Sequence, residues 1–233
     1  MGIAAPVSND NLIFSGTTRQ DTVNDISSLS IGWLRFANDG FTLNGNFLTL
    51  NPGTSGIFTN LAGTNVIAND LIIAPAAKYW SVAANSELRL TGGVTNTSPT
   101  GTSAGWLCLT GDGTVRIMNT TRSTRGMDLF QGAVIIDGGL VDAFNDGIRF
   151  KPPTGSTAAF RIINNGTLRI GGGGNFRLGN GATVVGGPAG AGSLSLMNLD
   201  SGTLELYGPA TSVQVGDTVA GATGVFNQNG GLV

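Results

Sequence analysis

The chain has 233 residues, of which 38 are glycine and only 11% are charged. Its 12 basic and 14 acidic residues give a formal net charge of −2, which argues against a binder of nucleic acid or of anionic membrane surfaces. Histidine is absent, which removes the commonest general base and the commonest metal ligand. No stretch has the roughly 20 consecutive apolar residues of a membrane span.

Short apolar runs separated by Asn-Gly, Asp-Gly and Gly-Gly pairs predict an all-β fold with many tight turns. In the first half of the chain, strands are expected at 11–14, 32–36, 41–43, 47–50, 71–73, 79–82, 87–90, 106–109 and 114–118. In the second half, they are expected at 134–136, 147–150, 159–163, 167–170, 175–178, 193–197, 203–207, 212–215 and 224–226. The exception is 21–29, where Val23, Ile26 and Leu29 recur every three residues and predict one helical turn.

A short phrase recurs along the chain: glycine, then Thr or Ser, then two apolar residues separated by one other. It reads Gly113-Thr-Val-Arg-Ile117, Gly166-Thr-Leu-Arg-Ile170, Gly192-Ser-Leu-Ser-Leu196 and Gly202-Thr-Leu-Glu-Leu206. Near the end, three strands that begin at Gly166 match three strands that begin at Gly202, which lies 36 residues later. Repeated units of this kind are typical of a solenoid, in which each coil buries its apolar face against its neighbours.

Stacking these units in register would place like side chains in internal columns. The residues expected to point inward alternate along each strand: Leu168 and Ile170, Phe176 and Leu178, Leu194 and Leu196, Leu204 and Leu206, Val213 and Val215. The sequence therefore predicts a right-handed parallel β-helix of roughly seven to ten coils that occupies residues 1–233 as one domain. An antiparallel sandwich or barrel is the alternative, because it also uses many short strands.

The two ends of such a solenoid expose strand edges unless they are capped. Residues 1–40 are the least repetitive part of the chain, and we expect them to cap the N-terminal end. The C-terminal end stops within a repeat phrase and is expected to be uncapped, so either further coils follow it in the native chain or its edge pairs with another molecule. For a secreted protein, an export signal is expected upstream of this segment.

Several phrases resemble a known family. The segments 11–19, 41–50 and 87–93 resemble the autotransporter-associated β-strand repeat proteins, in which phrases such as Phe41-Thr-Leu-Asn-Gly-Asn46 recur. Residues 224–233 are similar to a phrase of large surface proteins with a pectin-lyase-like β-helix. The resemblance implies a secreted or cell-surface passenger domain, a group of which most members have no known activity.

The residues that could support catalysis do not form a recognisable motif. Asp137, Asp142 and Asp146 are close in sequence, but they lie in turn-forming contexts. Cys108 sits in a strand-like run and is expected to be a small buried hydrophobe rather than a reactive thiol. We therefore expect no enzyme activity, no cofactor and no metal; a polysaccharide lyase or hydrolase on a β-helix remains the alternative.

One predicted surface could bind a ligand. Four arginines occupy outward positions of recurring strands and could form a stripe that contacts an anionic glycan: Arg89, Arg116, Arg169 and Arg177. Trp33, Trp80 and Trp106 could stack on sugars, but packing in the core or in a cap is the favoured interpretation. The chain is thus expected to be a non-catalytic extracellular structural or adhesive module. Its expected partners are copies of itself, joined through strand edges, or surface glycans.

Overall fold

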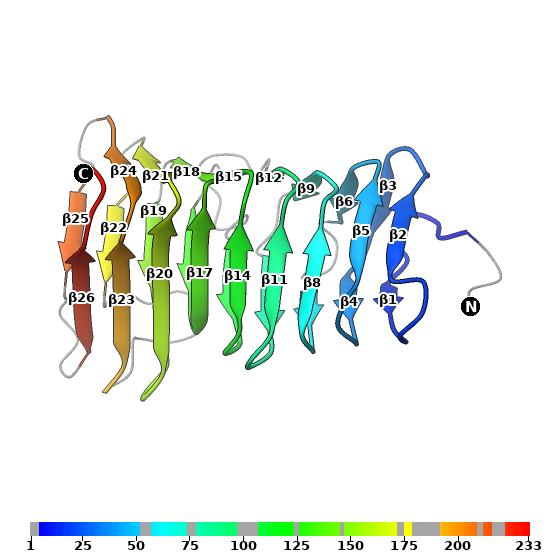
Figure 1. The fold of residues 1–233 in the computed structure, drawn as a ribbon, viewed down its shortest axis with the longest axis horizontal. Helices are drawn as coiled ribbons and strands as arrows, with labels where there is room; N and C mark the ends of the chain where they lie inside the picture. The colour runs from blue at the N-terminus through cyan, green and yellow to red at the C-terminus, as the bar shows by residue number, and fades with distance from the viewer. Residues whose placement is uncertain are drawn as a thin grey trace.

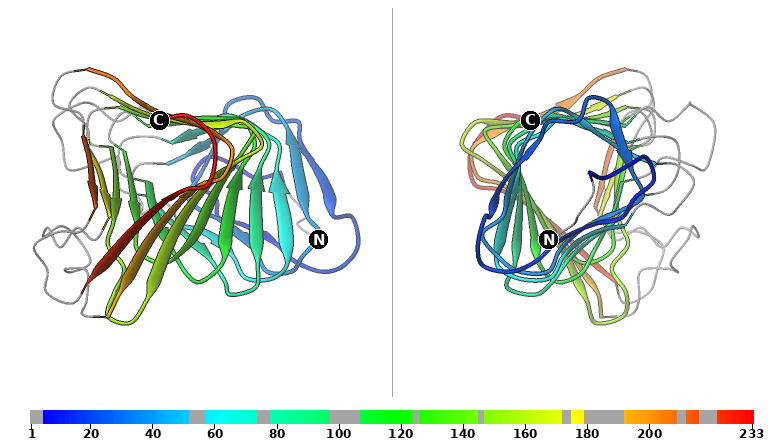
Figure 2. Two further views of the ribbon diagram at one scale, coloured as in Figure 1. Left: turned by 60° about the vertical axis from the view of Figure 1, so that its left-hand side comes forward. Right: turned by 90° about the vertical axis from the view of Figure 1, so that its right-hand side faces the viewer.

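The computed structural model describes residues 5–51, 57–73, 78–96, 107–123, 126–144, 147–171, 175–178, 192–208, 212–215 and 222–233. Its 26 strands form three long parallel sheets, and every described strand pair is parallel. Consecutive strands belong to consecutive sheets, so the chain winds around a common axis (Figure 1). Seen from the N-terminal end, it turns clockwise as it recedes, which makes the solenoid right-handed (Figure 2). The predicted right-handed parallel β-helix is confirmed.

Each sheet takes every third strand of the chain. Sheet A contains β1 (Leu12–Phe14), β4 (Leu34–Phe36), β7 (Ile57–Asn60), β10 (Lys78–Val82), β13 (Leu107–Thr110), β16 (Met127–Leu129), β19 (Gly147–Phe150), β22 (Asn175–Leu178) and β25 (Ser212–Val215). Sheet B contains β2 (Asp21–Asn24), β5 (Thr42–Gly45), β8 (Thr64–Ile67), β11 (Glu87–Leu90), β14 (Thr114–Ile117), β17 (Gly132–Asp137), β20 (Thr157–Ile163), β23 (Leu194–Leu199) and β26 (Thr223–Gln228). Sheet C contains β3 (Leu29–Ile31), β6 (Leu48–Leu50), β9 (Leu71–Ile73), β12 (Val94–Asn96), β15 (Thr120–Ser123), β18 (Leu140–Phe144), β21 (Gly166–Gly171) and β24 (Gly202–Leu206).

Among the described residues, sheet A and sheet B have nine strands each. The solenoid therefore has nine coils, within the predicted range of seven to ten. The 36-residue match is a true structural repeat, because Gly166 pairs with Gly202 and Leu168 with Leu204. Residues 12–36 already contribute β1 to β4, so this part of the predicted cap belongs to the sheets themselves. That these first coils cap the N-terminal end stays a prediction.

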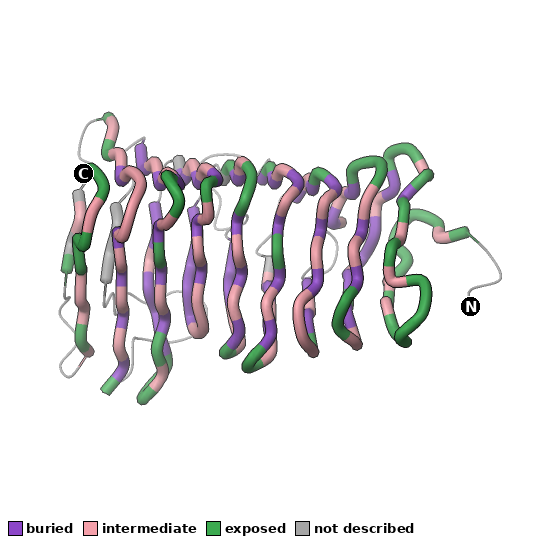
Figure 3. Tube along the Cα trace, viewed as in Figure 1, coloured by how far each residue is buried: buried purple, intermediate pink, exposed green. Residues whose placement is uncertain are grey.

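The core is one continuous apolar cluster that runs inside the coils. Buried and partly exposed residues alternate along the strands, as the alternating colours of Figure 3 show. In the first coils an aromatic column fills the centre: ring centroids are 5.3 Å apart between Phe14 and Phe36, and 5.8 Å apart between Phe36 and Phe58 and between Phe58 and Trp80. Trp80 is therefore a core residue, as the favoured interpretation had it; Trp33 is half-buried, and Trp106 lies outside the described residues.

The predicted helical turn at 21–29 is wrong. Residues Asp21–Asn24 form β2, which pairs in parallel with β5, and Leu29–Ile31 form β3. Val23 points outward and is 66% exposed, whereas Asn24 is buried and donates its side-chain amide to the Asn46 carbonyl at 3.0 Å. Pairing with the next coil outweighs a weak helical spacing in a segment this short.

The inward face predicted for β23 is also wrong. Ser195, Met197 and Leu199 are buried, while Leu194 and Leu196 are only half-buried. The run Leu-Ser-Leu-Met-Asn-Leu offers apolar residues to both faces, so alternation alone does not choose between them. The neighbouring coil decides, because Met197 stacks on Phe160 and Leu199 on Ile162. In the last coils Leu206 and Val215 keep their inward columns but are exposed at the open end.

The revised face of β23 can be tested by truncating adjacent residues. Met197→Ala should lower the free energy of unfolding by about 2–5 kcal/mol, because it leaves a cavity in a close-packed core. Leu196→Ala should cost clearly less, because this side chain is partly solvated already. Urea unfolding of the two variants and the parent chain measures the difference. An equal or larger loss for Leu196→Ala would contradict this register.

Candidate functional site

The four predicted arginines do not form a single stripe. Arg89 and Arg116 are register partners on the outer face of sheet B, but Arg169 lies on sheet C and Arg177 on sheet A. The stripe therefore reduces to one pair. The side chain of Arg177 lies outside what the structure describes, and its backbone pairs with that of Arg149. That these arginines contact a glycan stays a prediction.

The arginine pair on sheet B is held by acidic neighbours. Arg116 contacts Glu87 at 2.9 Å and Asp137 at 2.8 Å, and Arg89 contacts Glu87 at 2.6 Å. Partial burial would raise the pKa of Glu87, but the hydrogen bonds from Arg116 and Arg89 outweigh it and lower the pKa below its ordinary value. Arg169 is similarly engaged, with Glu205 at 2.6 Å and the Tyr207 ring centroid at 6.0 Å. The positive charges of these guanidinium groups are therefore largely balanced by carboxylates of the same chain.

A buried ion cluster lies on the outer face of sheet A. Asp128 is 3% exposed, and Arg149 holds both of its carboxylate oxygens at 2.7 and 2.9 Å. Lys151, also buried, donates to the same carboxylate at 3.0 Å. Burial lowers the pKa of Lys151, against the attraction of Asp128. Next to Asp128, in register, stands Cys108, which packs with Phe130 and Tyr79 in a small second apolar cluster.

Sequence reasoning missed this cluster. Asp128, Arg149 and Cys108 are 20 or more residues apart, and they meet only because β13, β16 and β19 stack in exact coil order. Only the strand register could have indicated the cluster, since it places Cys108, Asp128 and Arg149 in one outward column of sheet A. Burial raises the pKa of the Cys108 thiol to about 12, and Asp128 adds to the effect, so at neutral pH the thiol is protonated and is no nucleophile.

The outer face of sheet C carries a long shallow groove. Two adjoining hollows of about 420 and 280 Å³ share Thr120 and together extend across six coils, from Phe47 to Arg169. Their lining mixes hydroxyl, amide and charged groups with apolar ones: Phe47, Asp70, Leu71, Ile72, Gly93, Thr95, Met118, Asn119, Thr120, Arg122, Gly138, Gly139, Leu140, Asn165, Thr167 and Arg169. The side chain of Arg122 is exposed there and makes no hydrogen bond or ion pair with the described part of the chain.

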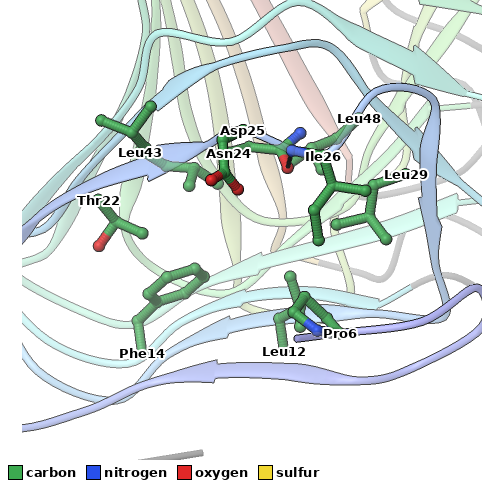
Figure 4. Close-up of a pocket in the computed structure, with 11 residues that line it drawn as sticks. Pro6, Leu12, Phe14, Thr22, Asn24, Asp25, Ile26, Leu29, Leu43 and Leu48 are labelled. Atoms are coloured by element: carbon green, nitrogen blue, oxygen red, sulfur yellow. Dashed lines mark hydrogen bonds between the residues drawn. The ribbon is translucent and has the colours of Figure 1, made fainter. Parts of the chain in front are cut away.

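At the N-terminal end, the described residues leave a hollow beside the core. A hollow of about 210 Å³ faces outward from the first coil, and Leu12, Phe14, Ile26 and Leu29 surround it (Figure 4). At the opposite end, Leu206 and Val215 are 39% and 51% exposed although they continue internal columns. Within the described residues, ten large apolar side chains are exposed. Seven of them lie at these two ends: Val7, Ile13, Val23, Leu206, Val215, Leu232 and Val233.

The three aspartates considered at the sequence level are not brought together. Asp137 accepts hydrogen bonds from Arg116 and Asn164 on sheet B, Asp142 accepts one from Tyr207 on sheet C, and Asp146 lies outside the described residues. Among the residues that are described, no group of three or more acidic or thiol side chains is placed to hold a metal. The same residues include no helix long and apolar enough to cross a membrane.

Comparison of the chain with known protein families, with curated proteins and with solved structures gave no match. The functional argument therefore stands on the geometry of the solenoid itself.

The buried thiol makes stability depend on pH above neutrality. Because the folded chain holds the Cys108 proton up to about pH 12 and the unfolded chain releases it near pH 9, unfolding becomes easier as pH rises between these values. The slope from this group should approach about 1.4 kcal/mol per pH unit. Cys108→Ala should remove that part of the slope and leave the contribution of the tyrosines. Urea unfolding of both chains from pH 8 to pH 11 measures it; parallel curves would contradict the assignment.

Proposed function

We propose that this chain is a non-catalytic extracellular structural or adhesive module, a stiff β-solenoid that assembles end to end through its exposed strand edges. The observation that supports the proposal most strongly is the state of the two ends. Among the described residues, both ends present strand edges and partly uncovered core side chains, and most of the exposed large apolar side chains lie in the end coils. Contiguous exposed apolar surface is a mark of interaction sites in soluble proteins.

The sides of the solenoid have a different character. Acidic and basic residues meet in short ion pairs along the coils, as in the Glu87, Arg116 and Asp137 group. Contact between these charged sides and water costs little free energy, whereas the ends expose apolar side chains and backbone edges to water. A rod with hydrated sides and adhesive ends favours growth along its axis. The low charge content and the family resemblance of the repeat phrases support an extracellular setting.

Assembly can be tested with charges placed on one end. The double variant Leu206→Lys, Val215→Lys should keep the fold, because both side chains are already exposed, and it should block contacts at the C-terminal end. Met118→Lys is the matched control, since Met118 is 43% exposed on a middle coil. Light scattering after size exclusion, with electron microscopy, should show concentration-dependent oligomers for the parent and the control only. A parent chain that stays monomeric at every concentration would refute assembly.

A second candidate function, glycan binding, is favoured by the groove on sheet C. Hydroxyl, amide and guanidinium groups line it together with apolar side chains over several coils, which suits a linear sugar polymer. Arg122→Ala should weaken binding in an array of polysaccharides, while Arg35→Ala, a change at an exposed arginine on sheet A, should leave it intact. No binding to any polysaccharide, or equal loss in both variants, would reject this function.

A further inference from the structure

We infer that the hollow at the N-terminal end receives the C-terminal end of a second copy of this chain, head to tail, so that sheets A, B and C continue across the junction. This inference rests on the proposed end-to-end assembly and specifies its partner and polarity. It assigns β1 and β2 of one copy to the edges beside β25 and β26 of the next, and β3 to the edge beside residues 231–233, which pair on β24.

Strand direction favours this polarity. All strands within a sheet run the same way, so the last strand of each sheet presents an edge that the first strand of the same sheet can join in parallel. Joining two N-terminal ends would instead make strands antiparallel and place sheet B of one copy against sheet C of the other. Only the head-to-tail arrangement repeats, at all three sheets together, the pairing that already joins each coil to the next.

The residues 229–233 illustrate this pairing at one edge. Leu232 forms a parallel bridge with Thr203, and its backbone exchanges hydrogen bonds of 2.9 Å with Gly202 and Leu204. Backbone added at this end thus follows the existing register of sheet C. The edges of β25 and β26 carry no such strand among the described residues.

The two ends also match in size and polarity. The N-terminal hollow holds about 210 Å³, more than the ~150 Å³ cavity that accommodates a benzene ring. Phe226, half-buried on β26, stands at the opposite end in the inward column above Met197. Leu206 and Val215 flank it on the other two sheets. Stacking would place these side chains against Phe14 and Leu29, which line the hollow (Figure 4).

Engineered disulfides distinguish the polarities. Asp21 on β2 and Asn227 on β26 are exposed, and the strand register places both in one outward column of sheet B. In a head-to-tail junction that continues this register they would lie on adjacent strands, with Cα atoms about 4.8 Å apart, within disulfide range. Asp21→Cys and Asn227→Cys chains carrying different tags are mixed under mild oxidation and separated on non-reducing gels. Val225→Cys, at another outward position of β26, covers a shift of two residues in register.

We expect mixed-tag dimers to exceed same-tag dimers severalfold for one of the two β26 positions. Met118→Cys, on a middle coil, serves as the control and should give no dimers; native Cys108 is buried and does not interfere. Dominant Asp21→Cys homodimers, or assembly in solution without any mixed disulfide, would overturn the head-to-tail inference and leave end-to-end assembly standing. No assembly and no disulfide would overturn both.

Discussion

The structure depends on one constraint, the parallel in-register pairing of each coil with the next. It satisfies the backbone groups of every interior strand, and it places like side chains on top of one another, inward ones in a dry core and outward ones in columns. A glycine with positive φ shows how tightly the corners pack: a Cβ on Gly202 would lie 2.2 Å from the carbonyl oxygen of Gly166 in the preceding coil. Gly113 and Gly166 of the same phrase also lack room for a Cβ, whereas Gly192 has no neighbour within 4 Å and is favoured by its positive φ alone.

Much of the fold could be predicted from the sequence because the repeat carries its own register. Gly166 and Gly202, and the apolar pairs that follow them, show both the coil length and the inward face. The prediction failed where one coil alone was ambiguous: β23 has apolar residues on both faces, and the buried residue Met197 is chosen by Phe160 in the preceding coil. Strands β8 and β15 were missed for a different reason: polar residues, Asn65 and Thr121, stand at their inward positions, so neither shows the apolar alternation.

The candidate sites were harder to predict, since they depend on which residues meet between coils of uneven length. The sequence around an outward arginine does not show which sheet its strand joins. The pattern alone therefore could not show that Arg89 and Arg116 lie on one sheet and Arg169 on another. The cluster of Asp128, Arg149 and Lys151 likewise needs the stacking order of three coils. The proposed role in assembly rests on the apolar side chains that are exposed at the two ends of the described coils.

The account is tested most directly by measuring how distance grows along one column. Val66, Arg161 and Asn227 are outward residues of sheet B, with Arg161 four coils and Asn227 six coils beyond Val66. Spin labels are attached at Val66 and Arg161 in one sample and at Val66 and Asn227 in another. At ~4.8 Å per coil, the labelled residues should have Cα atoms about 19 Å apart in the first pair and about 29 Å apart in the second. Pulsed electron paramagnetic resonance gives both distances. Values that do not increase in this ratio would contradict the coil-on-coil stacking.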